Sequence, residues 1–309
     1  MHKARYNLLR LNLEISPAGP LLIKSGGFST DPSPPDMQFV RTPRAGVGES
    51  LFIPGSSMKG VVRSFVEKAL RTIDDRSSWR WACPTFEKKK GEDQEPNCAQ
   101  RMKGESGEKE RAKRELASCD IYKESCGACK LFGSTLLRGR LAFTDMLPAD
   151  GVKIETETRY GVAISRLSHA VAQGPFEMEV AVSGSFSGQV ILENYEIWQM
   201  GVLAAALESM NHGQLKVGFG KNRGFGQVRV NINDASVEEI APVNDRHALR
   251  GLGRFVRDDE ERENYGLAEP YLLEGLTEPR EAKGAGFYEI RSYDSAGWKA
   301  IAENAIQAL

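Results

Sequence analysis

The stretch Ile53-Pro-Gly-Ser-Ser-Met-Lys-Gly-Val-Val-Arg-Ser64 contains the start of an amphipathic helix. Pro54-Gly55 interrupts the apolar strand before it, and we expect Ser56 or Ser57 to cap the N–H groups of its first turn. Apolar residues then recur at the three- and four-residue spacing of one helix face. They are Met58, Val61, Val62, Phe65, Ala69, Leu70 and Ile73. The sequence therefore predicts a helix with one buried face that begins at a tight turn.

Lys59 lies in the first turn of this helix, where a positive charge opposes the helix dipole by roughly 0.3 to 1 kcal/mol. A phosphate between the lysine and the helix end would remove the conflict, because helix N-termini bind anions. The alternative is a surface lysine on an ordinary helix. The segment is not a nucleoside-triphosphate loop, because Val61 stands where that motif requires lysine.

Length and composition indicate a globular chain. With 309 residues and 40% hydrophobic content, it can form one large or two modest domains. The sequence contains no apolar run near the roughly 18 residues of a membrane span and no apolar signal core after Met1. We therefore expect a cytoplasmic protein without a membrane partner.

Charge is distributed unevenly along the chain. Residues 231–309 contain 9 Lys and Arg against 16 Asp and Glu, a net charge of −7, whereas the whole chain carries −1. Residues 1–230 therefore carry +6, and this part is suited to a polyanionic partner.

The cysteines indicate a metal site. Five cysteines, an odd number in a chain without a secretion signal, argue against a disulfide framework. Cys126-Gly-Ala-Cys129 has the spacing of a metal knuckle, which needs two more ligands. Cys83, Cys98 and Cys119 are the candidates, and we favour Cys83 and Cys98 because Cys119 suits the core as a small apolar residue.

Zinc at Cys83, Cys98, Cys126 and Cys129 would fix a charged insertion over about 76–130 to the body of the domain. The alternative is a set of buried cysteines without metal. A redox pair is disfavoured, because we expect no helix directly after the Cys-Gly-Ala-Cys segment.

The remaining segments give the order of elements. We expect strands at 6–15 and 141–146, one bent strand or a pair of strands over 176–192, and a buried helix at 198–210 that is apolar nearly all round. Residues 215–230 then read as a strand, a glycine loop and another strand. The order strand, helix, strand, strand, helix, strand suits an α+β, ferredoxin-like sheet with two helices on one face, an architecture also used by readers of single-stranded RNA.

The glycine loop Gly218-Phe-Gly-Lys-Asn-Arg-Gly-Phe-Gly226 is the second candidate anion site. Its glycines let backbone N–H groups approach a phosphate, and Lys221 and Arg223 add charge with no acid between Gln214 and Val230. The alternative is a tight hairpin or a bulge.

Other candidates for chemistry are few. Asp36 follows a Pro-Ser-Pro-Pro loop, where a carboxylate binds a divalent ion, takes a proton or simply belongs to a turn. Only four histidines occur, and none pairs with a serine or cysteine in a nucleophile motif, which argues against a histidine-based hydrolase.

In combination, these segments resemble the RAMP superfamily of CRISPR proteins over residues 5–232. The resemblance rests on Ile53-Pro-Gly-Ser-Ser-Met-Lys-Gly60 with Arg63, on Cys126-Gly-Ala-Cys-Lys-Leu-Phe-Gly133 followed by Asp145, on Gly161-Val-Ala-Ile-Ser-Arg166, and on Gly218 to Gly226. The segments look most like those of backbone-type subunits of type III effector complexes, which line up along a guide RNA.

The resemblance implies a ferredoxin-like palm in residues 1–235, with the insertion at about 76–130 and a thumb-like hairpin at about 159–176. The acidic extension over 236–309 departs from the family's common pattern. The palm of this family grips the guide phosphates. The residues expected to contact RNA here are Ser56, Ser57, Lys59, Arg63, Arg166, Lys221 and Arg223. The acidic extension would dock a neighbouring subunit through its charge.

The resemblance also implies a role for Asp36. In several such subunits a loop aspartate promotes metal-dependent cleavage of the paired target RNA, so Asp36 is the expected Mg²⁺-dependent catalytic residue, with Asp31 as the fallback. The implied partners are guide RNA, target RNA and other RAMP subunits. One rival is a stand-alone, metal-independent endoribonuclease that processes precursor guide RNA through His169. Another is a zinc-stapled interaction module without RNA, which the positive charge of residues 1–230 disfavours.

Overall fold

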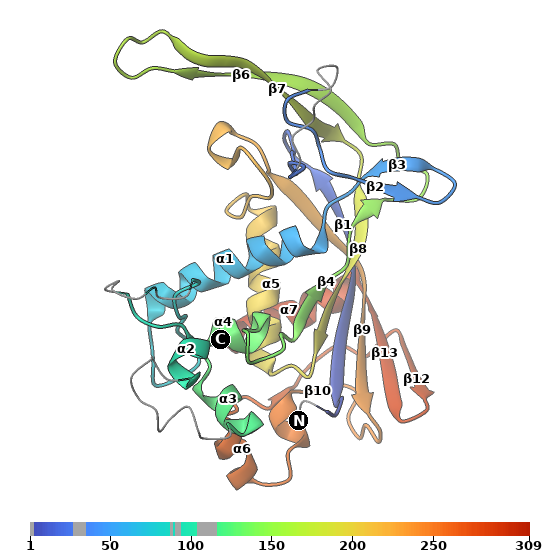
Figure 1. The fold of residues 1–309 in the computed structure, drawn as a ribbon. Coiled ribbons are helices and arrows are strands. Elements are labelled where there is room, and N and C mark those ends of the chain that lie inside the picture. Colours follow the sequence, from blue (N-terminus) through green and yellow to red (C-terminus); the bar gives the residue numbers. More distant parts are fainter. Residues whose placement is uncertain (1–2, 27–34, 87–88, 90–93, 104–115) are drawn as a thin grey trace.

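A seven-stranded antiparallel sheet forms the centre of the computed structural model, which describes residues 3–26, 35–86, 89, 94–103 and 116–309 (Figure 1). Six of the strands follow the order β12-β13-β9-β1-β8-β4, and β5 pairs with β8. The strands are β1 (Asn7–Pro17), β4 (Leu141–Phe143), β5 (Leu147–Pro148), β8 (Phe186–Glu193), β9 (Val228–Ile240), β12 (Glu281–Ala285) and β13 (Tyr288–Asp294).

The order of strands agrees with the predicted ferredoxin-like topology. Strands β1, β4, β8 and β9 occur in the chain order β-α-β-β-α-β, with α1 (Gly55–Ile73) after β1 and α5 (Ile197–Asn211) after β8. In the sheet β1 and β8 are central neighbours, flanked by β9 and β4. This arrangement is consistent with the ferredoxin-like fold, so the predicted α+β class is confirmed.

Helices α1 and α5 lie on the same side of the sheet (Figure 1). The predicted helix after Pro54 is confirmed as α1, but its buried stripe is Met58, Val62, Val66 and Leu70, whereas the predicted Ala69 and Ile73 are exposed. Helix α5 is buried nearly all round, as its uniformly apolar sequence predicts. The two helices therefore cover the apolar face of the sheet.

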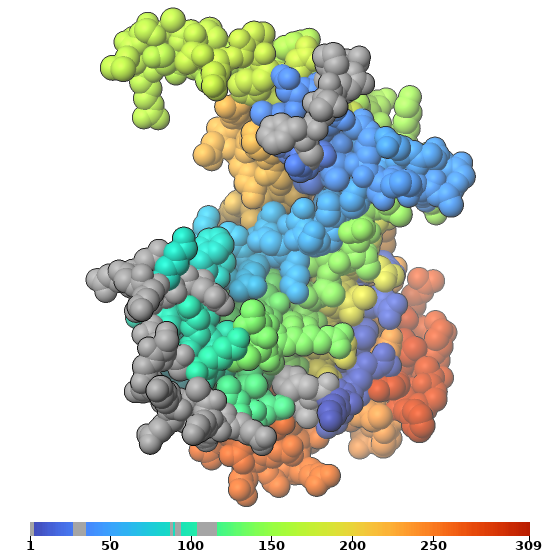
Figure 2. Space-filling model, in the orientation of Figure 1, coloured from blue at the N-terminus to red at the C-terminus, as the bar shows by residue number. Residues whose placement is uncertain are grey.

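A long hairpin stands away from the body. It consists of β6 (Glu155–Ile164) and β7 (Val171–Ser183), contains the predicted thumb region 159–176, and extends outward in Figures 1 and 2. Tyr160, Val162, Ile164 and Leu167 are exposed large apolar residues on it. The pair of strands expected over 176–192 corresponds to the second half of β7 and to β8. A second, shorter hairpin is formed by β2 (Arg41–Arg44) and β3 (Gly48–Leu51).

The cysteine-bearing insertion lies beside α1 (Figure 1) and contains α2 (Cys98–Lys103), α3 (Ser118–Glu124) and α4 (Gly127–Phe132). The expectation of no helix after the cysteine pair is wrong, because α4 begins at Gly127. Cys126 is its N-cap and accepts a hydrogen bond from the N–H of Cys129. Among the described residues, no helix is both long and apolar enough to cross a membrane.

The strand predicted before the glycine loop is absent from the described residues there, whereas the strand predicted after it is present as β9. Residues 215–217 form no strand, and the loop holds the short 3₁₀ turn η2 (Lys221–Arg223) before β9. Gly218 turns the chain there with φ +83°, and a Cβ on it would lie 2.3 Å from the Leu22 carbonyl oxygen. The close approach of the Leu22 segment thus replaces the expected strand pairing.

The acidic C-terminal segment is continuous with the sheet. It contains β10 (Leu249–Arg250), η3 (Leu252–Phe255), α6 (Asp259–Tyr265), β11 (Leu272–Leu273), β12, β13 and α7 (Ser295–Gln307). The expected boundary at residue 235 falls inside β9, because β13 satisfies the backbone groups of β9 from Asp234 to Ile240. A fully buried ion pair of 2.9 Å between Arg291 and Glu239 also joins β13 to β9.

Candidate nucleic-acid interface and metal centre

The start of α1 is capped by a distant carboxylate, not by its own serines. The backbone N–H of Gly55 donates to Asp145 Oδ1 at 2.8 Å, whereas neither Ser56 nor Ser57 caps the helix. A Cβ on Gly55 would lie 2.2 Å from the Phe143 carbonyl oxygen, so only glycine lets the helix begin this close to the end of β4. The expected serine cap is wrong. The Asp145 carboxylate occupies part of the anion-binding position expected at the start of α1.

Lys59 is half-buried one turn into α1. Burial, and then the nearby Arg63 charge, lower the pKa of its ammonium group below the ordinary value. A lysine in this environment gains from an added anion, because a phosphate would offset both effects. The geometry keeps Lys59 as a candidate RNA contact.

The glycine loop brings further positive charge to α1. Lys221 and Arg223 are exposed on η2, between Gly220 and Gly224, whose φ values of +73° and +86° favour glycine. Burial, and then the charge of Lys68 on α1, lower the pKa of Lys221. Lys221 and Lys68 are therefore neighbours, and with Arg223 they form a basic face where the glycine loop meets the middle of α1.

Arg223 also touches the root of the long hairpin. Its guanidinium carbon lies 5.2 Å from the centre of the Phe176 ring on β7. A Cβ on Gly161 of β6 would lie 2.5 Å from that ring and 3.3 Å from Arg223 Nη1. The glycine in the Gly161-Val-Ala-Ile segment thus provides the space in which loop and hairpin meet.

Arg166 and His169 lie at the opposite end of the hairpin, in the exposed turn between β6 and β7. His169 has φ +54° and donates its backbone N–H to the Ser165 carbonyl. The structure therefore separates both residues from the basic face at the hairpin root.

Asp36 lies at the root of the hairpin. It is exposed, and its Oδ2 accepts the backbone N–H of Glu177 on β7 at 2.9 Å. Asp36 belongs to no cluster of three or more acidic, cysteine or histidine ligands among the described residues. Mg²⁺ binding therefore gains no support from its surroundings, and the fallback Asp31 lies outside the described residues.

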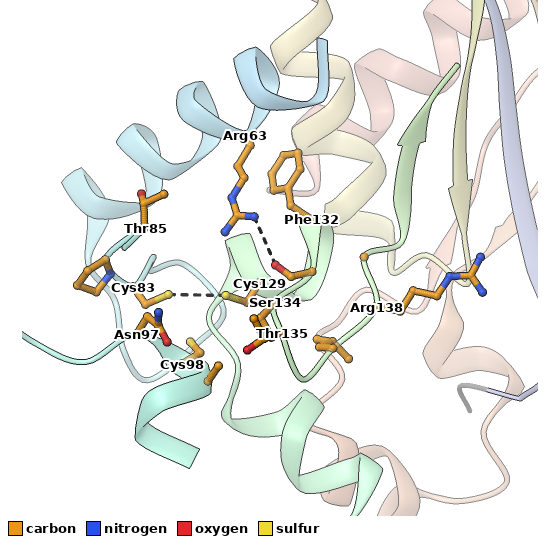
Figure 3. A pocket seen from close by; sticks show the side chains of 15 residues that line it. Arg63, Cys83, Thr85, Asn97, Cys98, Cys129, Phe132, Ser134, Thr135 and Arg138 are labelled. Carbon is orange, nitrogen blue, oxygen red and sulfur yellow. Dashed lines mark hydrogen bonds between the residues drawn. The ribbon is translucent and has the colours of Figure 1, made fainter. Parts of the chain in front are cut away.

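Arg63 extends from α1 toward the cysteine-bearing insertion (Figure 3). Its Nε donates to Glu67 at 2.7 Å, its Nη1 contacts the Gly133 carbonyl oxygen at 3.5 Å, and Figure 3 shows it extending from α1 toward the cysteines. Burial opposes the charged form, but the hydrogen bond with Glu67 and the charges of Glu67, Cys129 and Cys83 raise its pKa.

Four of the five cysteines converge. The Sγ atoms of Cys83, Cys98, Cys126 and Cys129 lie within 4.8 Å of one another, and all four residues are buried. Two come from the loop after α1 and from α2, and two from the knuckle at the start of α4. Cys119 lies outside the cluster and is half-buried. The structure thus brings together the set that the sequence favours.

The crowded thiols favour a cation between them. Hydrogen bonds from Cys126, and then Cys129 and Cys98, lower the pKa of Cys83, while those with Cys126 and Cys83 raise the pKa of Cys129. Four thiolates cannot ionise together at this spacing without a positive charge to hold them. Four sulfur ligands are the donor set of structural zinc sites, so the residues fit a metal such as zinc.

A cavity of about 470 Å³ borders the cysteines on the α1 side (Figure 3). Sequence reasoning missed the carboxylates that organise this region. Glu67 is buried between Arg63 and Arg71, and its only sequence signal is the i,i+4 spacing on both sides. Asp145 gave no signal as a cap, because it is distant from Gly55 in sequence.

The sequence model of the RAMP superfamily matches residues 14–229. The chain belongs to the RAMP superfamily. No curated protein matches it. RAMP membership indicates a CRISPR-associated role in RNA binding, and the matched region contains the basic face, the hairpin and the four cysteines.

Proposed function

We propose that this RAMP protein is a guide-RNA-binding structural subunit of a type III CRISPR interference complex. The observation that carries the proposal is the meeting of Lys68 on α1 with Lys221 and Arg223 on the glycine loop, on the helix whose first turns also carry Lys59. Two sequence-distant basic segments on one face suit a phosphate backbone, not a single nucleotide.

RNA binding by this face is largely independent of sequence. Lysine side chains contact phosphate oxygens as point charges, and such contacts fix position without reading bases. Base pairing between guide and target then supplies specificity. The hairpin of β6 and β7 serves as the thumb, with Arg223 and Phe176 at its root and Arg166 at its tip. Target RNA and other RAMP subunits are the remaining partners.

A zinc ion at Cys83, Cys98, Cys126 and Cys129 holds the insertion against α1. A closed set of four thiolates leaves no open position, so its role is structural. Metal analysis of purified protein should find about one zinc per chain. Cys126→Ser should lose most of that zinc and unfold at a lower temperature than the wild type. Cys119→Ser should keep the wild-type zinc content and unfolding temperature. Zinc retained in Cys126→Ser would contradict the assignment.

Asp36 is the proposed residue for target cleavage, and it also has a structural use, because its carboxylate accepts the backbone N–H of Glu177. The assembled complex should cut target RNA in Mg²⁺ and lose one cut in Asp36→Ala. Asp36→Ser, which keeps a hydrogen-bond acceptor, separates the two roles: restored cleavage would identify Asp36 as a loop anchor. An unchanged cut pattern in both variants would leave Asp36 with no part in cleavage.

Binding of single-stranded RNA by the purified chain tests the central proposal. Fluorescence anisotropy at low salt should give similar affinities for RNAs of different sequence, and co-expression with a guide should yield the chain bound to RNA and other RAMP subunits. Failure to bind single-stranded RNA would refute the proposal. Cleavage of precursor RNA without metal that is lost in His169→Ala would instead identify the processing nuclease.

A further inference from the structure

Two arginines approach the four-cysteine centre from outside it. Arg101 of α2 donates from Nη2 to Cys98 Sγ at 3.7 Å, and its guanidinium lies over the Trp81 ring at 4.8 Å. Arg63 of α1 lines the cavity that Cys83, Cys98 and Cys129 also line (Figure 3). The two cations come from different helices: Arg101 contacts Cys98 directly, whereas Arg63 shares a cavity wall with Cys83 and Cys129.

A filled centre requires such cations. A divalent ion with four thiolate ligands carries two excess negative charges, and burying uncompensated charge is costly. Backbone donors supply part of the compensation, because the Cys126 N–H donates to Cys98 Sγ at 3.3 Å and the Cys129 N–H to Cys126 Sγ at 3.4 Å. These donors are dipoles, so they leave the net charge unbalanced.

Arg63 is held in position by a network of its own. The buried Glu67 accepts from Arg63, from Arg71 and from Thr85 Oγ1. Arg71 also donates to the Cys83 carbonyl oxygen at 3.0 Å. The network ties the guanidinium of Arg63 to the loop that carries Cys83, which is a position suited to the metal centre and not to a passing RNA strand.

We propose that Arg63 and Arg101 are positioning residues for the metal centre, forming the charged shell that offsets its negative charge. This inference rests on the proposed metal site. It reassigns Arg63 from the RNA grip to the cysteines, and Lys59 stays the RNA-contacting candidate in the first turns of α1.

Paired variants test the inference. Zinc affinity is measured by chelator competition for wild type, Arg63→Gln, Arg101→Gln and the corresponding lysine variants. Each glutamine variant should bind zinc about 10-fold more weakly or worse. The lysine variants should recover part of the loss, because they restore charge without the planar fork. Arg76→Gln is the matched control, since Arg76 lies over the same Trp81 ring at 5.5 Å but pairs with Asp74 and Glu95.

Two further measurements separate positioning from mere stability. Removing an N–H donor from sulfur should shift the thiolate-to-cobalt absorption of Co²⁺-substituted protein in Arg101→Gln but not in Arg76→Gln. Arg63→Gln should leave the salt dependence of RNA binding unchanged. Should the glutamine variants fail to fold, the lysine variants provide the comparison.

The outcomes are distinct. Wild-type zinc affinity and unshifted cobalt spectra in the Arg63 and Arg101 variants would overturn the inference while the metal centre stands. A reduced salt dependence in Arg63→Gln with unchanged zinc affinity would return Arg63 to the RNA grip. A wild-type chain that binds no metal would refute the proposed metal centre itself.

Discussion

The salt dependence of RNA binding offers the sharpest test of the basic face. Five cations of α1 and the glycine loop are the candidate phosphate contacts, because Arg63 and Arg71 of α1 pair with Glu67. They are Lys59, Lys68, Lys216, Lys221 and Arg223. At about −0.7 per phosphate contact for a single strand, five contacts give a slope of log affinity against log salt of about −3.5. Replacing Lys59 and Lys221 by glutamine should therefore reduce the slope to about −2.1.

This difference is large enough to measure. Between roughly 50 and 200 mM salt, the wild type should lose affinity about 130-fold and the double variant only about 18-fold. Fluorescence anisotropy with a labelled single-stranded RNA, titrated at several salt concentrations, gives both slopes. Lys283→Gln with Lys299→Gln is the control, because these lysines are exposed on the C-terminal segment and pair with Glu281 and Glu303.

The expected result is a change of slope in the Lys59 and Lys221 variant alone. Equal slopes in wild type and variant would refute the reasoning, because they would mean that α1 and the glycine loop do not meet the same strand. A similar loss in the control variant would show that the chain responds only to total charge.

Three further predictions concern the start of α1. Asp145→Asn should lower the free energy of unfolding by about 0.3 to 1 kcal/mol through the helix dipole while tightening RNA binding by removing a negative charge; weaker binding would show that Asp145 itself serves the RNA site. Gly55→Ala should destabilise the protein by about 1 to 3 kcal/mol in urea unfolding, because its Cβ would meet the Phe143 carbonyl, whereas Gly60→Ala, with nothing within 4 Å, should be neutral or stabilising by about 0.5 to 1 kcal/mol. Because the pKa of Lys59 is lowered in the free protein, RNA affinity should be full at neutral pH and decline at a less alkaline pH than an ordinary lysine requires. Lys59→Arg should move this decline upward, and an unmoved decline would exclude Lys59 as its source.

Local patterns in the sequence predicted most of the elements. Helix α1 followed from its three- and four-residue apolar spacing, and α5 from an unbroken apolar run, because burial of an apolar face stabilises a helix wherever it lies. The strand expected at 215–217 failed because Gly218 and the Leu22 segment decide that backbone path. Residue 235, where the acidic extension is expected to begin, lies inside β9, because β13 from the far end of the chain pairs with this strand and the local composition of β9 does not show that contact.

The sequence by itself determined which groups are present: a basic palm, two glycine-bearing turns and four cysteines able to hold a metal. Thiol chemistry and charge are properties of the residue types, so the sequence alone is enough to infer them. Only the tertiary structure decided where the side chains point. It turned Arg63 toward the cysteines and brought Asp145 to the start of α1. Both outcomes depend on contacts between residues far apart in the chain, which no local spacing encodes.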